Sequence, residues 1–182
     1  LLSIATEVEG HPDNITPAMF GGFVMSSTED DGSILYKKID WPQEWKTTIC
    51  IPDFELATQI SRSVLPETVS FADAAFNAKR CAMFIQAVHT KDADLMRYAL
   101  KDKLHQPYRS RFVPGFDEII TTLNETDVMG AVLSGAGPSI LIISSNNNIE
   151  EVKNRIRTIW EPLGVKSNIK TVDIDNKGAI IL

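Results

Sequence analysis

The chain has 182 residues and a formal net charge of −6, with 18 Lys and Arg against 24 Asp and Glu. This length is enough for one domain with its own hydrophobic core, or for a domain plus part of another. The acidic balance disfavours a surface for nucleic acid or for an anionic membrane, because both partners call for clustered Lys and Arg. No apolar run reaches the roughly 18 residues that a membrane helix needs. We therefore expect a small-molecule partner.

The first residues are spaced like the end of a helix. Leu1, Ile4 and Val8 recur at helical intervals, and no capping residue precedes them. We expect the chain to be a fragment that begins inside a helix. Turn-rich segments follow at 10–14 and 17–22, and then two strands, Phe23–Ser27 and Ile34–Ile39, which the segment Glu29–Gly32 joins as a hairpin.

A domain border is predicted near residue 44, after Pro42 and its polar neighbours. Residues 1–44 would then be the remnant of one domain, and residues 45–182 would form a second. The second part begins with a strand, Trp45–Ile51, and continues with a long helix from a Ser70 capping box to about His89. A further helix is predicted over Asp92–Leu104.

The last third of the chain reads as strands around one helix. Short apolar strands are predicted at Ala131–Leu133 and Ile140–Ser144, then a helix capped by Asn148 and ended by Gly164. Final strands are predicted at Ile169–Ile174 and Ala179–Leu182. The order of strand, two or three helices, two strands, helix and strand favours an α+β fold, a ferredoxin-like sheet with helices on one face.

The two cysteines indicate a reducing environment. Cys50 lies in a strand-like context and Cys81 in a helix-like context, and no metal-ligand spacing links them to other residues. We predict that both are reduced, buried thiols, as is usual in the cytoplasm.

Three features combine residues that often carry chemistry, and each also has an ordinary structural explanation. His11, Asp13 and Asn14 follow a helix end, where they could simply cap a turn. The segment Ser134–Ser139 contains closely spaced glycines, which suit an anion site or a tight hairpin equally. Arg80 borders an apolar helix face and Arg109 follows a helix; either could bind an anion, extend to solvent or interact with a helix carboxyl end.

Taken together, these segments resemble the homoserine kinases of the GHMP kinase superfamily. The resemblance rests on four segments in the family's order and spacing and extends from Leu1 to Leu182. They are Glu7-Val-Glu9-Gly-His11-Pro-Asp13-Asn14 with the following Gly21-Gly22, Asp73-Ala-Ala-Phe-Asn77-Ala-Lys-Arg80, Asp102-Lys-Leu-His105-Gln-Pro107-Tyr-Arg109, and Leu133-Ser-Gly135-Ala-Gly137-Pro-Ser139.

The resemblance implies transfer of the γ-phosphoryl group of ATP to the side-chain hydroxyl of L-homoserine, on the route to threonine. It further implies the end of a GHMP amino-terminal domain followed by a ferredoxin-like carboxy-terminal domain. It allows a homodimer, and the sequence does not determine the oligomeric state. The resemblance also gives each candidate residue a role: Glu7 as a ligand of Mg²⁺, Asp13 and Asn14 as catalytic residues that orient the hydroxyl, and His11, Arg80, Arg109, Gly135, Gly137 and Ser139 as substrate-binding residues.

Two other functions remain open. One is a different GHMP kinase, acting on mevalonate, shikimate or a sugar, although a pair of arginines favours an amino-acid carboxylate. The other is a non-catalytic ferredoxin-like module that binds an amino acid, since fold alone does not determine function. The family's Gly- and Ser-rich phosphate loop is absent from the sequence, so we expect the chain by itself to fold without turning over ATP.

Overall fold

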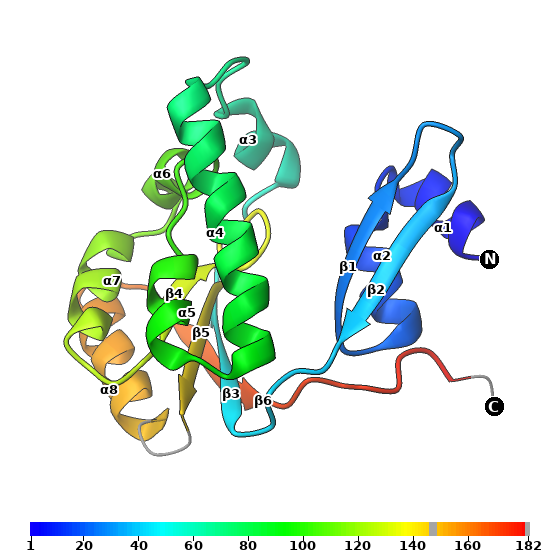
Figure 1. Cartoon of the computed structure of the whole chain (residues 1–182). Coiled ribbons are helices and arrows are strands. Elements are labelled where there is room, and N and C mark those ends of the chain that lie inside the picture. Colours follow the sequence, from blue (N-terminus) through cyan, green and yellow to red (C-terminus); the bar gives the residue numbers. More distant parts are fainter. Residues whose placement is uncertain (146–148, 181–182) are drawn as a thin grey trace. The chain divides into compact units, whose positions relative to one another are not determined.

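The computed structural model describes residues 1–145 and 149–180 and divides into two compact units (Figure 1). The first consists of Leu1–Pro42 with the described part of Asp173–Leu182, and the second of Gln43–Val172. Residues 173–180 thus pack with the first residues of the chain.

The first unit contains two helices and a two-stranded antiparallel sheet. These elements are α1 (Leu2–Glu9), α2 (Pro12–Phe20), β1 (Phe23–Thr28) and β2 (Ile34–Ile39). The predicted hairpin is confirmed, with Phe23 opposite Ile39 and Thr28 opposite Ile34. The predicted helix end is also confirmed as α1, but Ile4 and Val8 are exposed in it.

Helix α2 replaces the turn-rich segment that the sequence predicted. Its start tolerates Pro12, because the first helical residues have no intrahelical partner for their N–H groups. The hydroxyl of Thr16 is buried and donates to the carbonyl oxygen of Pro12 at 2.6 Å. Pro17 lies inside the helix without ending it, and the helix continues to Phe20 before Gly21. Two prolines led the sequence analysis to a turn, since proline usually interrupts helices.

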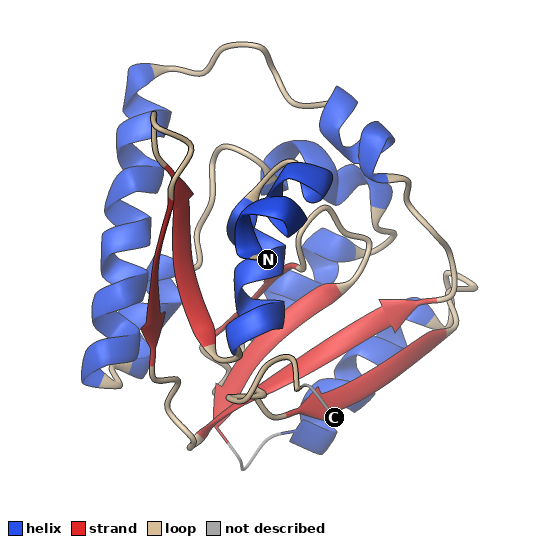
Figure 2. Cartoon of the chain, turned by 90° about the vertical axis from the view of Figure 1, so that its right-hand side faces the viewer, coloured by secondary structure: helices blue, strands red, loops and turns tan. Residues whose placement is uncertain are grey.

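The second unit is a four-stranded antiparallel sheet with helices. Its elements are β3 (Trp45–Pro52), α3 (Thr58–Ser63), α4 (Phe71–Thr90), α5 (Ala93–Ala99), α6 (Gln106–Arg109), η1 (Ser110–Phe112), α7 (Phe116–Asn124), β4 (Gly130–Leu133), β5 (Ile140–Ser145), α8 (Ile149–Trp160) and β6 (Ser167–Val172). The strand order is β4-β5-β3-β6, and the strands lie side by side in Figure 2. Each helical connection therefore joins strands separated by one other strand, which confirms the ferredoxin-like layout.

The core of this unit lies between the sheet and helices α7 and α8. Fully buried side chains come from both layers: Cys50, Ile140 and Ile142 from the strands, and Ile119, Leu123, Val152, Ile156 and Trp160 from the helices. The Trp160 indole N–H donates to the carbonyl oxygen of Pro114 at 2.9 Å, so its polar atom is satisfied inside the core. Helices α3 and α7 were not among the predicted elements, and more helices connect β3 to β4 than the two or three expected.

The long helix has the predicted start. Ser70 accepts a hydrogen bond from the backbone N–H of Asp73 at 3.0 Å and donates from its hydroxyl to the Asp73 carboxylate at 2.6 Å. The bond from the Ser70 hydroxyl, followed by one from Lys103, lowers the pKa of the Asp73 carboxyl. A side-chain cap of this kind satisfies an N–H group that the helix itself leaves unpaired.

Several other sequence predictions need correction. The helix predicted to reach Leu104 ends at Ala99, and no strand contains Ala179 or Ile180. Burial raises the pKa of the Cys50 thiol to about 12, as a buried thiol requires, but Cys81 is exposed. Helix α8 ends at Trp160, before Gly164. The predicted cap Asn148 and the last two residues of the predicted final strand lie outside the described residues.

Candidate functional site

The first group of predicted site residues lies where α1 gives way to α2. Helix α1 ends at Glu9 and is followed by Gly10, whose φ of 92° is left-handed and whose N–H donates to the carbonyl oxygen of Thr6. His11 follows in extended conformation as the residue before α2, and Asp13 lies in the first turn of that helix. The imidazole Nδ1 of His11 contacts the carboxylate of Asp13. The structure thus brings His11 and Asp13 together, while Asn14 is exposed beside them.

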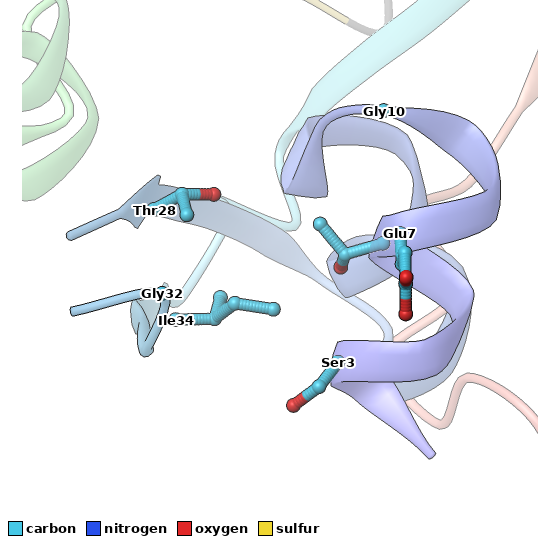
Figure 3. Close-up of a pocket in the computed structure, with 7 residues that line it drawn as sticks. Ser3, Glu7, Gly10, Thr28, Gly32 and Ile34 are labelled. Carbon is cyan, nitrogen blue, oxygen red and sulfur yellow. The ribbon is translucent and has the colours of Figure 1, made fainter. Parts of the chain in front are cut away.

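Glu7 lines a pocket in the first unit. The pocket has a volume of about 390 Å³ and is lined by Ser3, Thr6, Glu7 and Gly10 from the α1 side and by Thr28, Gly32 and Ile34 from the hairpin (Figure 3). Among residues 1–145 and 149–180, no cluster of three or more His, Cys, Asp or Glu could form a metal cage. A single carboxylate nevertheless fits Mg²⁺, which keeps several waters and is commonly held by one or two carboxylates and the phosphates of a substrate.

Arg80 lies on α4, one turn after Asn77. Its guanidinium carbon is 4.4 Å from the centre of the Phe76 ring, and one terminal nitrogen is 3.3 Å from the sulfur of Met83. The Nε atom is buried and has no hydrogen-bond partner in the described part of the chain. An arginine with an unused buried N–H keeps capacity to bind an anion, because an unpaired buried donor is energetically costly.

Arg109 is held against the glycine-rich loop. Its Nε donates to the carbonyl oxygen of Ser61 at 3.1 Å, and Nη1 donates to that of Gly135 at 3.4 Å. The Ser61 hydroxyl, on α3, donates to the carbonyl oxygen of Ala136 at 2.6 Å. The structure therefore joins two residues that the sequence predicted separately, Arg109 and Gly135. Both guanidinium groups carry only donors, so a bound carboxylate would have to link them, and the action of Arg80 and Arg109 on one carboxylate stays a prediction.

The loop between β4 and β5 exposes backbone donors. The N–H of Ser134 bonds the carbonyl oxygen of Ser139 at 2.8 Å, which closes the loop. Gly135 and Gly137 have φ angles of 58° and 82°, in the left-handed region that favours glycine. The N–H groups of Gly135 and Ala136 donate to no described acceptor. Such groups can bind an anion, which keeps the predicted role of this loop chemically reasonable.

Asp102 was not among the predicted site residues, although it lies in one of the recognised segments. Its carboxylate accepts hydrogen bonds from the side chain of Asn77 and from the backbone N–H groups of three successive residues, Leu104, His105 and Gln106. Burial raises the pKa of Asp102, but the hydrogen bonds, led by that of the Gln106 N–H, outweigh it and lower the pKa from 3.8. An Asp shortly before a helix is a capping signal that sequence reasoning could have used.

The lowered pKa predicts a pH-dependent stability. The unfolded chain binds a proton at Asp102 more readily than the folded chain, so the contribution of the carboxylate is complete well above pH 3.8 and is lost as the pH falls through the folded-state pKa. Asp102→Asn removes this contribution. The difference in free energy of unfolding between wild type and D102N should therefore shrink as the pH falls from neutral to well below 3.8, as measured by urea denaturation. A difference that is constant across this range would contradict the prediction.

Much of the second unit matches a known family. A family model described as GHMP kinases C terminal matches residues 84–161. Residues 84–161 are thus similar to the carboxy-terminal domain of GHMP kinases. This matched part contains Arg109 and the glycine-rich loop, whereas Arg80 lies just before it.

The curated proteins similar to this chain include homoserine kinases. The homoserine kinase of Aquifex aeolicus is 44% identical over 178 residues, which are 97% of this chain and 59% of that protein. That of Clostridium botulinum is 40% identical over 182 residues, 100% of this chain and 60% of that protein. A crystal structure of homoserine kinase from Cytophaga hutchinsonii has a TM-score of 0.89 at 24% identity, covering 97% of this chain and 58% of that chain.

The chain therefore spans about three-fifths of the length of these curated relatives. The fold likeness extends to more distant proteins, such as a galactokinase of Lactococcus lactis with a TM-score of 0.55 at 13% identity. At 13% sequence identity, this structural likeness shows a shared fold and nothing about function. No helix among the described residues is long and apolar enough to cross a membrane.

Proposed function

We propose that this chain is the carboxy-terminal part of a homoserine kinase, which transfers the γ-phosphoryl group of ATP to the side-chain hydroxyl of L-homoserine. The observation that carries this proposal is the similarity to homoserine kinases, at 40 and 44% identity, over nearly the whole chain. The product would be O-phospho-L-homoserine in threonine biosynthesis, and the reaction would take place in the cytoplasm. A homodimer is compatible with this function.

The proposed roles follow the chemistry of each group. Arg80 and Arg109 would bind the substrate carboxylate, because a guanidinium forms paired, charge-assisted bonds to carboxylate oxygens. Gly135, Gly137 and Ser139 would close over the substrate. The N–H groups of Gly135 and Ala136, which donate to no described acceptor, would be available to oxygen atoms.

In the first unit, His11, Asp13 and Asn14 would orient the reacting hydroxyl. Phosphoryl transfer depends mainly on positioning and on neutralising charge, so a general base is not required. The contact of Asp13 with the His11 imidazole supports an orienting role for both. Glu7 would contribute one ligand to Mg²⁺, which when bound neutralises charge on the phosphates of ATP.

The direct test determines which hydroxyl compound accepts the phosphoryl group from ATP when the complete kinase is assayed. ADP release should require L-homoserine and should remain at background with mevalonate, shikimate or galactose. Phosphorus NMR should detect O-phospho-L-homoserine as the product. Equal or greater turnover with another hydroxyl compound would identify a different GHMP kinase, and binding of homoserine without any ATP consumption would favour the non-catalytic module.

Glu7→Gln should raise the Mg²⁺ concentration needed for half-maximal rate by about tenfold or more, because the amide lacks the charge of a metal-binding carboxylate. The melting temperature should change little, because Glu7 is exposed and makes no ion pair with a described residue. Glu9→Gln, on the same helix, is the matched control. An unchanged Mg²⁺ requirement in E7Q, together with an increased one in E9Q, would transfer the metal role to Glu9.

A further inference from the structure

Asp102 connects the two elements that carry the proposed carboxylate-binding arginines. On one side, its Oδ1 accepts a 2.5 Å hydrogen bond from the side-chain amide of Asn77, one turn before Arg80 on α4. On the other side, its Oδ2 accepts from the N–H groups of His105 and Gln106 at 2.9 and 2.6 Å, at the start of α6. Arg109 is the last residue of α6.

The side chain of Asn77 uses both of its polar atoms in this connection. While Nδ2 donates to Asp102, Oδ1 accepts from the backbone N–H of Lys103 at 2.9 Å. The amide therefore bonds two successive residues of the segment that leads from α5 to α6. Two bonds fix this segment to α4 more firmly than one, because each limits the rotation that the other leaves free.

Further hydrogen bonds connect the start of α6, next to Asp102, to the glycine-rich loop. Gln106, whose N–H bonds Asp102, accepts with its own side-chain oxygen a 3.0 Å bond from the N–H of Leu133, the last residue of β4. Three residues later, Arg109 donates to the carbonyl oxygen of Gly135. The short helix is thus attached at its start to α4 and along its length to the strand and loop that follow.

We propose that Asp102, together with Asn77, is a positioning residue for homoserine recognition. It holds α4 and α6 in one arrangement, so that Arg80 and Arg109 can act on the same carboxylate, and it does not itself touch the substrate. This inference rests on the proposed function. The role needs a carboxylate, since both oxygens accept two bonds each, from the Asn77 amide and the Leu104 N–H at Oδ1 and from the His105 and Gln106 N–H groups at Oδ2.

The main test is Asp102→Asn in the complete kinase. Asparagine offers one acceptor oxygen in place of two. Its side-chain NH2 group would face N–H donors that now bond to the second carboxylate oxygen. The homoserine KM should rise about fivefold, because a small misplacement of binding groups is costly, whereas the ATP KM should change by less than about twofold. A merely structural role would lower stability without separating the two KM values.

The control variant must lower the stability of the protein while leaving the hydrogen bonds of Asn77 and Asp102 intact. Asp92→Ala removes the cap of α5, where the carboxylate accepts a 2.8 Å bond from the N–H of Leu95. D92A should lower the melting temperature while leaving both KM values unchanged. If D102N does not fold, Asn77→Ala supplies the test, because it removes the link to α4 and preserves the three backbone bonds of Asp102.

The exchanged pair tests the geometry itself. In Asn77→Asp combined with Asp102→Asn, the donor and acceptor swap places, and the new carboxylate can still accept from the N–H of Lys103. The homoserine KM of the double variant should therefore lie between the raised value of D102N and the wild-type value. A normal homoserine KM in D102N or N77A, or no recovery in the exchanged pair, would overturn the positioning role. Absence of homoserine phosphorylation by the wild-type kinase would instead overturn the proposed function.

Discussion

Replacing Arg109 with lysine in the complete kinase should raise the homoserine KM by about tenfold or more and leave the KM for ATP nearly unchanged. Lysine keeps the positive charge but lacks the planar fork. Arg109 uses Nε and Nη1 to hold the carbonyl oxygens of Ser61 and Gly135, so the variant would lose both the loop contacts and the proposed bonds to substrate. Steady-state kinetics with each substrate varied in turn would measure both constants.

Arg80→Lys should also raise the homoserine KM, but for a different reason than Arg109→Lys. The Arg80 guanidinium lies over the Phe76 ring and contacts the Met83 sulfur, and within the described residues its buried Nε has no hydrogen-bond partner. Arg80→Lys therefore breaks no backbone bond to a described residue. If both arginines bind one carboxylate, the double variant should lose less binding free energy than the sum of the single variants.

Arg111→Lys is the matched control for both variants, since Arg111 lies two residues beyond Arg109 and its guanidinium is 5.2 Å from the Phe112 ring centre. It should leave the homoserine KM unchanged. If R80K and R109K also leave it unchanged, the carboxylate-binding role of this pair is wrong, and the main chemical reason for preferring homoserine over other acceptors is lost.

Gly178→Ala should destabilise the first unit by about 2–4 kcal/mol, the largest loss of stability that we predict. Gly178 has a φ of 70°, and an added Cβ would meet the carbonyl oxygen of Met19 and lie 2.5 Å from the N of Gly21. These are backbone atoms at the end of α2, so they cannot move aside as a flexible side chain would. Gly21 faces the same contact, because a Cβ there would lie 2.6 Å from the N of Gly178.

The contact matters because it attaches the end of the chain to the first unit. The N–H of Gly22 donates to the carbonyl oxygen of Asp175 at 2.7 Å, and that of Ala179 donates to the carbonyl oxygen of Met19 at 3.1 Å. The Lys38 ammonium also donates to the carbonyl oxygen of Asn176 at 2.6 Å. Hydrogen exchange in peptides spanning 17–24 and 175–180 would report the loss locally, since those amides should exchange faster in G178A.

Gly32→Ala is the control that separates the backbone strain of a left-handed alanine from the steric clash of an added Cβ. Gly32 has a φ of 79°, similar to that of Gly178, but an added Cβ would have nothing within 4 Å. This variant should cost about 1 kcal/mol, the expense of a left-handed conformation alone. Equal losses in G32A and G178A would show that the close approach of Gly178 to α2 contributes nothing beyond backbone strain.

Local signals in the sequence predicted those parts of the fold that depend on neighbouring residues. The Ser70 cap of α4 and the hairpin around Gly32 involve bonds between residues at most a few positions apart, such as the 2.9 Å bond from the Gly32 N–H to the carbonyl oxygen of Glu29. The alternation of strands and helices likewise sufficed for the ferredoxin-like layout. Local rules failed at α2, where two prolines indicated a turn although tertiary packing stabilises a helix.

For the candidate site, the motifs were enough to name the residues and the chemistry to consider, because the spacing of a motif can be read without knowing how the chain packs. Which of these residues meet depends on packing: Arg109 contacts the loop at Gly135, and Asp102 lies between α4 and α6. Packing also places residues 173–180 against the end of α2. These contacts join segments that are far apart along the chain. They form where two backbones come close together and where N–H groups lack a partner within their own helix or strand. No short sequence pattern encodes either condition.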